Sequence, residues 1–330
     1  MKDLSTTYLG LKLRNPVIAA SSGLTLNMED LVALDKSGIG AIVLKSIFEE
    51  EIRMELEKDQ FQMNKDSFIY PETMDFYDDF NVVDDELTRY LRIIREAKKN
   101  TAVPVIASIN CVTAEKWPYY AGVLQDAGAD ALELNVFALP TNFNITAQET
   151  EQLYFDIVDH VKKEVSIPIS LKISFYNSNL GSLIKRLSES GVAGIVLFNR
   201  FYNPDIDPET FEITSSHVFS TPQEVSLTLR WIAIMAGRVK CDLAASTGIH
   251  DGMTVVKQIL AGAQAVEIAS VLYRKGIPYV TEMLKDMEEW MDRKGFDSVD
   301  EFRGKVSQAA VKDPAAFERV QFMKYFAGKE

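Results

Sequence analysis

The sequence has 330 residues, of which 47% are hydrophobic and 25% are charged. This composition is ordinary for a globular protein, and a chain of this length can bury a core without disulfides or a structural metal. The formal net charge of −13 argues against a broad nucleic-acid-binding surface. No segment has the roughly 18 consecutive apolar residues of a membrane span.

The N-terminal residues lack the apolar run of a secretory signal peptide, so the sequence predicts a cytoplasmic protein. Two cysteines, Cys111 and Cys241, follow neither a metal-binding nor a redox spacing, which fits a reducing compartment. The three histidines lie far apart in the sequence, and we therefore expect no metal site.

Short apolar, β-branched runs recur eight times along the chain, each followed by an amphipathic stretch. Near-continuous apolar runs of this length are typical of parallel strands that are buried on both faces. The expected strands are residues 16–21, 41–46, 103–109, 129–136, 167–173, 194–199, 241–246 and 265–270.

Between these runs, apolar residues follow a helical spacing, and glycine stands near the end of each helical stretch. Such a helix shortly before a strand is typical of αβ units. Eight units predict a closed (β/α)8 TIM barrel that spans residues 1–330 as one domain, with an open, doubly wound sheet as the alternative. The clearest helical stretches are residues 27–36, 119–126, 183–190 and 254–260.

Two segments fall outside this repeat. Residues 49–86 form a long, acidic insertion after the second strand. This insertion is either a surface excursion or, as we favour, a lid over the mouth of the barrel, because long βα insertions usually carry function. Residues 296–330 are expected to form a C-terminal helical extension against the outside of the barrel.

Polar residues follow almost every expected strand. Catalytic sites of such barrels are assembled at the C-terminal ends of the strands. We therefore expect two lysines and three asparagines to converge on one site, namely Lys45, Lys172, Asn110, Asn135 and Asn199. A lysine inside a buried strand also needs a partner or a ligand.

The ends of the last two strands predict a phosphate-binding cradle. Residues 246–252, Ser-Thr-Gly-Ile-His-Asp-Gly, open a loop into a helix, and Ala269-Ser270 end the following strand. Small residues allow backbone N–H groups to approach a phosphate, and a helix N-terminus adds a favourable dipole. Aldolases and synthases share this pattern, so it does not select one activity.

Taken together, these motifs give the chain a resemblance to the dihydroorotate dehydrogenases, and most of all to the soluble class 1 enzymes. The resemblance covers about residues 5–305 and implies bound FMN, a small, cyclic, anionic substrate and a homodimer. The motifs, in order, are residues 15–21 (Asn-Pro-Val-Ile-Ala-Ala-Ser), 43–46 (Val-Leu-Lys-Ser), 133–135 (Glu-Leu-Asn), 171–172 (Leu-Lys), Asn199 and 246–248 (Ser-Thr-Gly).

The resemblance also assigns roles to residues. It places Lys172 near the N1–O2 edge of the flavin, where a cation stabilises the reduced ring, and makes Lys45 and Lys172 the expected catalytic residues. The expected FMN contacts are Ser21, Lys45, Ser46, Asn135, Lys172, Ser216, Thr247, Gly248, Ala269 and Ser270. The expected substrate contacts are Lys45, Ser67, Asn135, Asn199 and Arg200.

The sequence departs from the family pattern at the catalytic base. Class 1 enzymes place a cysteine, and class 2 enzymes a serine, in the loop after the fourth strand, where this sequence has Ala138. Alanine cannot accept a proton, and Thr141 or Asn142 nearby would need activation to do so. Asp66 and Glu72 replace two amides, and their carboxylates would repel orotate. We therefore expect a divergent member with a shifted substrate.

Other interpretations stay open at the level of sequence. Lys172 or Lys45 could form a Schiff base in a flavin-free, phosphate-binding lyase or aldolase. The missing base at Ala138 also fits a catalytically silent barrel that binds a flavin or metabolite and has a regulatory role. Arg200 is either a ligand for a carboxylate or phosphate or a surface arginine that caps a helix end.

Overall fold

The computed structural model describes residues 2–51, 86–111, 116–136, 139–201, 203–215 and 218–318. Among these residues, eight parallel strands close into one barrel, because β4 pairs with both β3 and β6. The predicted (β/α)8 barrel is therefore confirmed and the open sheet is excluded. The barrel strands are β3 (Val17–Ala19), β4 (Ala41–Val43), β6 (Val105–Asn110), β7 (Ala131–Asn135), β8 (Ile169–Ile173), β9 (Gly194–Leu197), β12 (Asp242–Ser246) and β13 (Ala265–Ile268).

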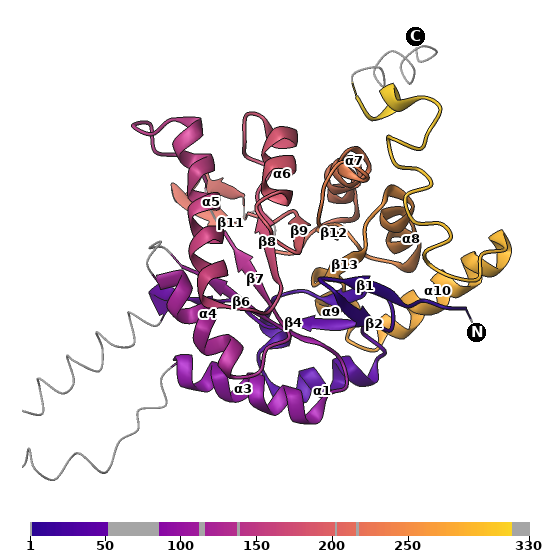
Figure 1. The fold of residues 1–330 in the computed structure, drawn as a ribbon, viewed down its shortest axis with the longest axis horizontal. Coiled ribbons are helices and arrows are strands. Elements are labelled where there is room, and N and C mark those ends of the chain that lie inside the picture. The colour runs from indigo at the N-terminus through magenta and orange to yellow at the C-terminus, as the bar shows by residue number, and fades with distance from the viewer. Residues whose placement is uncertain are drawn as a thin grey trace, which may run out of the picture.

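Helices surround the barrel, as Figure 1 shows. Each of the four helical stretches expected from the sequence overlaps one of them. The α-helices are α1 (Met28–Lys36), α3 (Glu86–Asn100), α4 (Lys116–Asp126), α5 (Ala147–Glu164), α6 (Leu180–Ser188), α7 (Val225–Met235), α8 (Gly252–Ala261), α9 (Ser270–Lys275) and α10 (Tyr279–Lys294). Short 3-10 helices are η1 (Gly23–Thr25), η3 (Pro222–Glu224) and η4 (Pro314–Phe317).

Local sequence signals start and stop several of these helices. The Asn27 side chain accepts a hydrogen bond from the Asp30 N–H at the first turn of α1. Thr146 and Glu149 form a reciprocal capping box at the start of α5. Gly295 ends α10 in a left-handed conformation, with φ of 75°, which glycine adopts without a steric cost.

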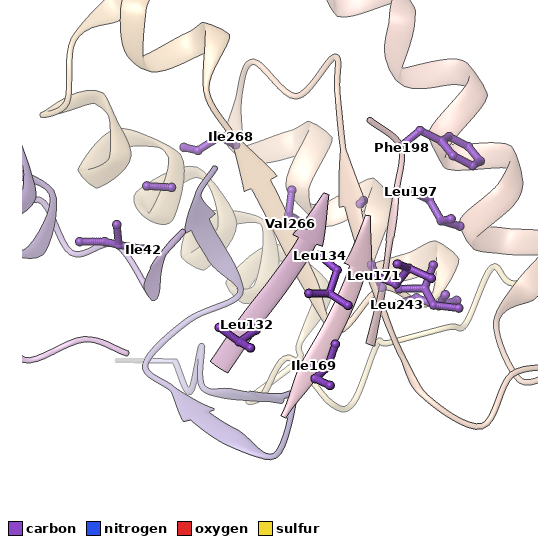
Figure 2. Close-up of a cluster of buried hydrophobic side chains, with 14 of the residues drawn as sticks. Ile42, Leu132, Leu134, Ile169, Leu171, Leu197, Phe198, Leu243, Val266 and Ile268 are labelled. Carbon is purple, nitrogen blue, oxygen red and sulfur yellow. The ribbon is translucent and has the colours of Figure 1, made fainter. Parts of the chain in front are cut away.

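The main hydrophobic core lies between the barrel and its helices. Side chains alternate along each strand, so every second residue points outward toward a helix. Leu132 and Leu171 of neighbouring strands and Val266 of β13 belong to this layer, and each is fully buried. Figure 2 shows them together with other outward-facing side chains of the barrel. This layer explains why the strand sequences are almost continuously apolar.

A hairpin that the sequence analysis did not identify closes the N-terminal end of the barrel. It consists of β1 (Thr6–Tyr8) and β2 (Leu11–Leu13), which pair antiparallel. Tyr8, Leu9 and Leu13 pack inside the barrel, and the Leu9 N–H donates to Asp242 Oδ2 at 2.8 Å. The inward-facing barrel residues in this cluster are Ile18, Ala41, Val43, Ile106, Ala131, Val196, Ala244 and Ala265.

Gly194, at the start of β9, leaves room for this hairpin. A Cβ atom at Gly194 would lie 2.5 Å from Leu9 Cδ2 and 3.3 Å from Tyr8 Cε2. A second antiparallel hairpin, β10 (Pro204–Asp207) and β11 (Glu212–Ser215), follows β9. The short strand β5 (Ile47–Phe48) extends the barrel sheet beside β6. The hairpin thus fills the barrel at the N-terminal ends of the strands, and the C-terminal ends are left open for a site.

The two segments outside the repeat are only partly described. Residues 52–85 of the expected lid lie outside the described residues. In the expected C-terminal helical extension, the described residues 296–318 form turns and the 3-10 helix η4 rather than α-helices. Phe302 anchors this stretch by packing against Trp290 of α10, with ring centroids 5.0 Å apart. Within the described chain, no helix is both long and apolar enough to cross a membrane.

Candidate active site

A cavity of about 570 Å³ opens at the C-terminal ends of the barrel strands. Its size is within the range of small-molecule and cofactor sites. All five polar residues that were expected to converge line this cavity: Lys45, Asn110, Asn135, Lys172 and Asn199. They come from five different strand ends, so only the closed barrel brings them together.

The structure places most of the predicted contact residues in the same cavity. The predicted residues that line it are Ser21, Lys45, Ser46, Asn135, Lys172, Asn199, Arg200, Thr247, Gly248, Ala269 and Ser270. Ser67, Ser216 and Ala138 lie outside the described residues. Thr141 and Asn142, the alternative bases, are exposed and do not line the cavity.

A chain of hydroxyl and amide groups runs along one wall of the cavity. The Ser46 N–H donates to Ser21 Oγ at 2.8 Å, and Ser46 Oγ shares a hydrogen bond with Ser108 Oγ at 2.7 Å. Asn135 Nδ2 donates to Ser46 Oγ at 3.3 Å, and Asn199 Nδ2 donates to Asn135 Oδ1 at 2.5 Å. These bonds hold the ends of five strands in one arrangement before a ligand binds.

The floor of the cavity is charged and buried. Lys172 Nζ lies 2.6 Å from Glu267 Oε2 and 3.3 Å from Glu133 Oε1. Burial and the Glu267 charge raise the pKa of the Glu133 carboxyl well above its usual range. The buried lysine thus has partners, as the sequence required. Burial opposes the charged form of Lys172, yet Glu133 and Glu267 outweigh it and raise the pKa of the ammonium.

At the end of the cavity that the sequence predicts to bind phosphate, two residues have left-handed backbone conformations. Thr247 and Gly248 have φ of 80° and 77°. A non-glycine residue with positive φ is uncommon and is concentrated at functional sites. A Cβ atom at Gly248 would lie 2.2 Å from Val225 N, so only glycine fits there. The Ser220 N–H donates to Ser270 Oγ at 2.9 Å and links the segment before η3 to the start of α9.

Arg200 lines the cavity but is held by neighbouring groups. Its Nε donates to Glu224 Oε1 at 2.8 Å and its Nη1 to the Val218 carbonyl at 2.9 Å. A third bond goes from Nη2 to the Phe219 carbonyl at 3.4 Å. These contacts attach the segment around residue 219 to the end of β9, so Arg200 supports the wall of the cavity.

Sequence reasoning missed the acidic residues of the floor. Glu133 and Glu267 occupy inward-facing positions within strands that are otherwise apolar. A charged residue at such a position was the available signal, because a buried carboxyl needs a partner. Aromatic residues of the cavity, Phe48, Phe198 and Tyr273, were missed as well, since nothing in their sequence context separates them from core residues.

The sequence profile of the family described as dihydroorotate dehydrogenase matches residues 3–291. The chain belongs to the dihydroorotate dehydrogenase family. The resemblance inferred from the strand-end motifs is therefore confirmed.

Curated relatives in this family cover nearly the whole chain. A protein of Thermoplasma volcanium, named dihydroorotate dehydrogenase B (NAD(+)), catalytic subunit, is 26% identical over 92% of this chain and 98% of its own length. Proteins of the same name from Thermoplasma acidophilum and Methanothermobacter thermautotrophicus are 26% and 24% identical, over 92% and 91% of this chain. The latter two are covered over 99% and 97% of their own lengths.

Proposed function

We propose that this chain is an FMN-dependent oxidoreductase of the dihydroorotate dehydrogenase family, and that its substrate is a small, cyclic, anionic compound other than dihydroorotate. The observation that carries the proposal is the convergence of Lys45, Lys172 and the three asparagines at the mouth of one barrel, in a cavity that Thr247, Gly248, Ala269 and Ser270 also line. Family membership makes the chain an oxidoreductase, and the cofactor and substrate are the proposed parts.

The described residues fit FMN at both ends of the cavity. Gly248 lets its loop pack against the start of α7, because a Cβ atom there would lie 2.2 Å from Val225 N, and Ala269 and Ser270 line the cavity with small side chains. These residues would hold the phosphate through backbone N–H groups. Lys172 and Asn135, which both line the cavity, would hold the ring system. When bound, FMN supplies hydride transfer, which no side chain can perform.

The substrate would lie over the wall formed by Lys45, Asn135 and Asn199. The three side chains offer an ammonium and two amides, which suit a ring with a carboxylate and carbonyl groups. Lys45 Nζ pairs with Glu51 Oε2 at 3.2 Å, at the start of the 49–86 insertion. This contact places the Glu51 carboxylate beside a lysine that lines the cavity.

The shift of substrate rests on the missing base. Ala138 cannot remove the proton that accompanies hydride transfer from dihydroorotate. Because Thr141 and Asn142 stay outside the cavity, neither replaces a base there. The same observation supports a second candidate, a silent flavin-binding barrel with a regulatory role.

The deciding measurement is the visible spectrum of the purified chain, before and after reconstitution with FMN. We expect a flavin spectrum that anaerobic dihydroorotate leaves oxidised and that dithionite bleaches. If the protein takes up no FMN, the proposed cofactor is wrong and a lyase or aldolase is favoured. Borohydride trapping of a carbonyl substrate on lysine would then identify that activity. Bleaching by dihydroorotate rejects the substrate shift. Reduction by another cyclic acid separates the enzyme from the silent barrel.

Location and assembly complete the proposal. Cys111 and Cys241 are both unpaired, which supports a reducing, cytoplasmic environment. The β10–β11 hairpin exposes Ile206, Phe211 and Ile213, with 67%, 87% and 81% of each residue accessible. Contiguous exposed apolar side chains mark interaction surfaces, and this supports a homodimer.

A further inference from the structure

Two carboxyl groups and one ammonium share the floor of the cavity. The side chains of Lys172, Glu133 and Glu267 are 9%, 1% and 0% exposed, and the ammonium contacts both carboxyl groups. If both carboxyl groups were ionised, the cluster would carry a net charge of −1 inside the barrel. An uncompensated buried charge is costly, so the cluster lacks one proton for neutrality.

Hydrogen-bond accounting calls for the same proton. Glu267 Oε1 is buried and has no hydrogen-bond partner among the described residues. Glu133 and Glu267 meet side chain to side chain, but two carboxylates have only acceptor atoms. A proton on one of them provides the donor that the contact needs. This is the usual arrangement for two carboxyl groups at close range, which do not both ionise.

The other titratable groups near the floor do not supply this charge. Tyr8 reaches toward it from β1 and Tyr90 from α3, and burial raises the pKa of both hydroxyls, so both are neutral. Tyr90 already donates to the Ser108 carbonyl at 3.2 Å. Asp242 acts on Tyr8 from below and accepts from the Leu9 N–H. Among the described residues, Glu133, Glu267 and Lys172 are thus the ionisable groups that contact one another at the floor, and Asp242 acts on Tyr8 from its other side.

We propose that Glu133 and Glu267 share a single proton, so that Lys172 meets a bound ligand as an ammonium with one carboxylate counter-ion and one neutral acid. The two glutamates are positioning residues, because they act on the ligand through Lys172. Either carboxyl group alone can serve as the counter-ion. Removing one leaves the cluster neutral, whereas removing both leaves Lys172 as an uncompensated cation.

The first test needs no cofactor. Infrared spectra of the ligand-free full chain at neutral pH report the carbonyl stretch of a protonated carboxylic acid. We expect this band in the wild type and its loss in both Glu133→Gln and Glu267→Gln. Asp242→Asn and the exposed Glu289→Gln are controls that keep the band. A band that persists in both glutamate variants would overturn the proposal.

The second test rests on the proposed function and uses the midpoint potential of bound FMN. Each single glutamine variant is expected to change the ratio of reduced to oxidised flavin affinity by less than tenfold, about 30 mV for two electrons. The double variant is expected to raise this ratio at least a hundredfold, about 60 mV, because a bare cation favours the reduced, anionic ring.

The two tests separate the two proposals. Equal, additive rises in the single variants would mean that both carboxyl groups are ionised in the wild type, and would overturn the shared proton. If the double variant does not fold, the two single variants still decide the question, because the midpoint potential either stays nearly unchanged in both or rises equally in both. A chain that never binds FMN rejects the proposed function, while the infrared result alone then decides the shared proton.

Discussion

At the scale of single residues, the site is a set of polar groups whose partners are supplied by other strands. Lys172 is tolerable inside the barrel because Glu133 and Glu267 face it, and Asn135 is oriented by Ser46 and Asn199. Each of these side chains would be costly alone in an apolar interior. Their chemistry is therefore a property of the cluster, and pH is the simplest way to test it.

Glu133 should make stability depend on pH. Above its ordinary pKa of 4.5, the folded protein keeps a proton on Glu133 that the unfolded chain releases. The folded state then binds more protons, so the free energy of unfolding falls as pH rises through the folded pKa. Glu133→Gln should remove this difference of up to one bound proton and so reduce the slope by up to about 1.4 kcal/mol per pH unit. Urea unfolding of the apoprotein between about pH 5 and pH 8 measures it.

Glu289→Gln on α10 serves as the control, because it removes one exposed carboxyl group far from the buried floor of the cavity. Identical slopes for the wild type and Glu133→Gln would show that Glu133 is ionised in the folded protein.

At the scale of elements, the β1–β2 hairpin decides how deep the cavity is. Its Tyr8, Leu9 and Leu13 fill the N-terminal end of the barrel, where the small inward-facing side chains of Ala41, Ala131, Ala244 and Ala265 leave space for them. Gly194 is the tightest point of this contact. We therefore expect replacement of Gly194 by alanine to lower stability, whereas the same substitution at a glycine inside a helix should raise it.

Gly194→Ala should destabilise the protein by about 1–3 kcal/mol, because the added Cβ overpacks Leu9 inside the barrel. Gly122→Ala should stabilise it by about 0.5–1 kcal/mol, because Gly122 lies within α4 and a Cβ there meets Glu164 Cγ at an ordinary 3.4 Å. Denaturant unfolding of both variants measures the pair. A gain in stability for Gly194→Ala would mean that the hairpin does not fill the barrel.

At the scale of the whole molecule, the barrel presents a site at one end and an apolar hairpin at its side. Among the described residues, Phe211 and Ile213 of this hairpin are 87% and 81% exposed, and Phe143 in the loop before α5 is 100% exposed. Such exposure is costly for solubility unless a partner covers it. A second copy of the chain is the partner that we propose.

Phe211→Glu should convert the dimer into a monomer, because a carboxylate at the centre of an apolar interface is left unpaired when buried. Light scattering coupled to size-exclusion chromatography measures the mass directly. Val306→Glu is the control: Val306 is 44% exposed and lies in the C-terminal segment, which Figure 1 places across the molecule from the hairpin. A wild-type protein that runs as a monomer would contradict the prediction.

The sequence by itself determined the barrel, because eight buried strands with intervening amphipathic helices leave few architectures that bury both faces of each strand. It also identified Lys45, Lys172 and the strand-end asparagines, because the C-terminal ends of all barrel strands lie at the same end of the barrel. Their convergence on one cavity follows from closure, which joins β4 to β6.

Only the tertiary structure decided what surrounds those residues. Glu267 meets Lys172 from a strand 95 residues later, and the hairpin that fills the lower barrel comes from the N-terminus. Arg200, which the sequence left open between ligand and surface residue, is fastened to Glu224 by the fold. These contacts join residues far apart in the chain, and periodicity describes only neighbours, so local pattern could name the chemical groups but not their partners.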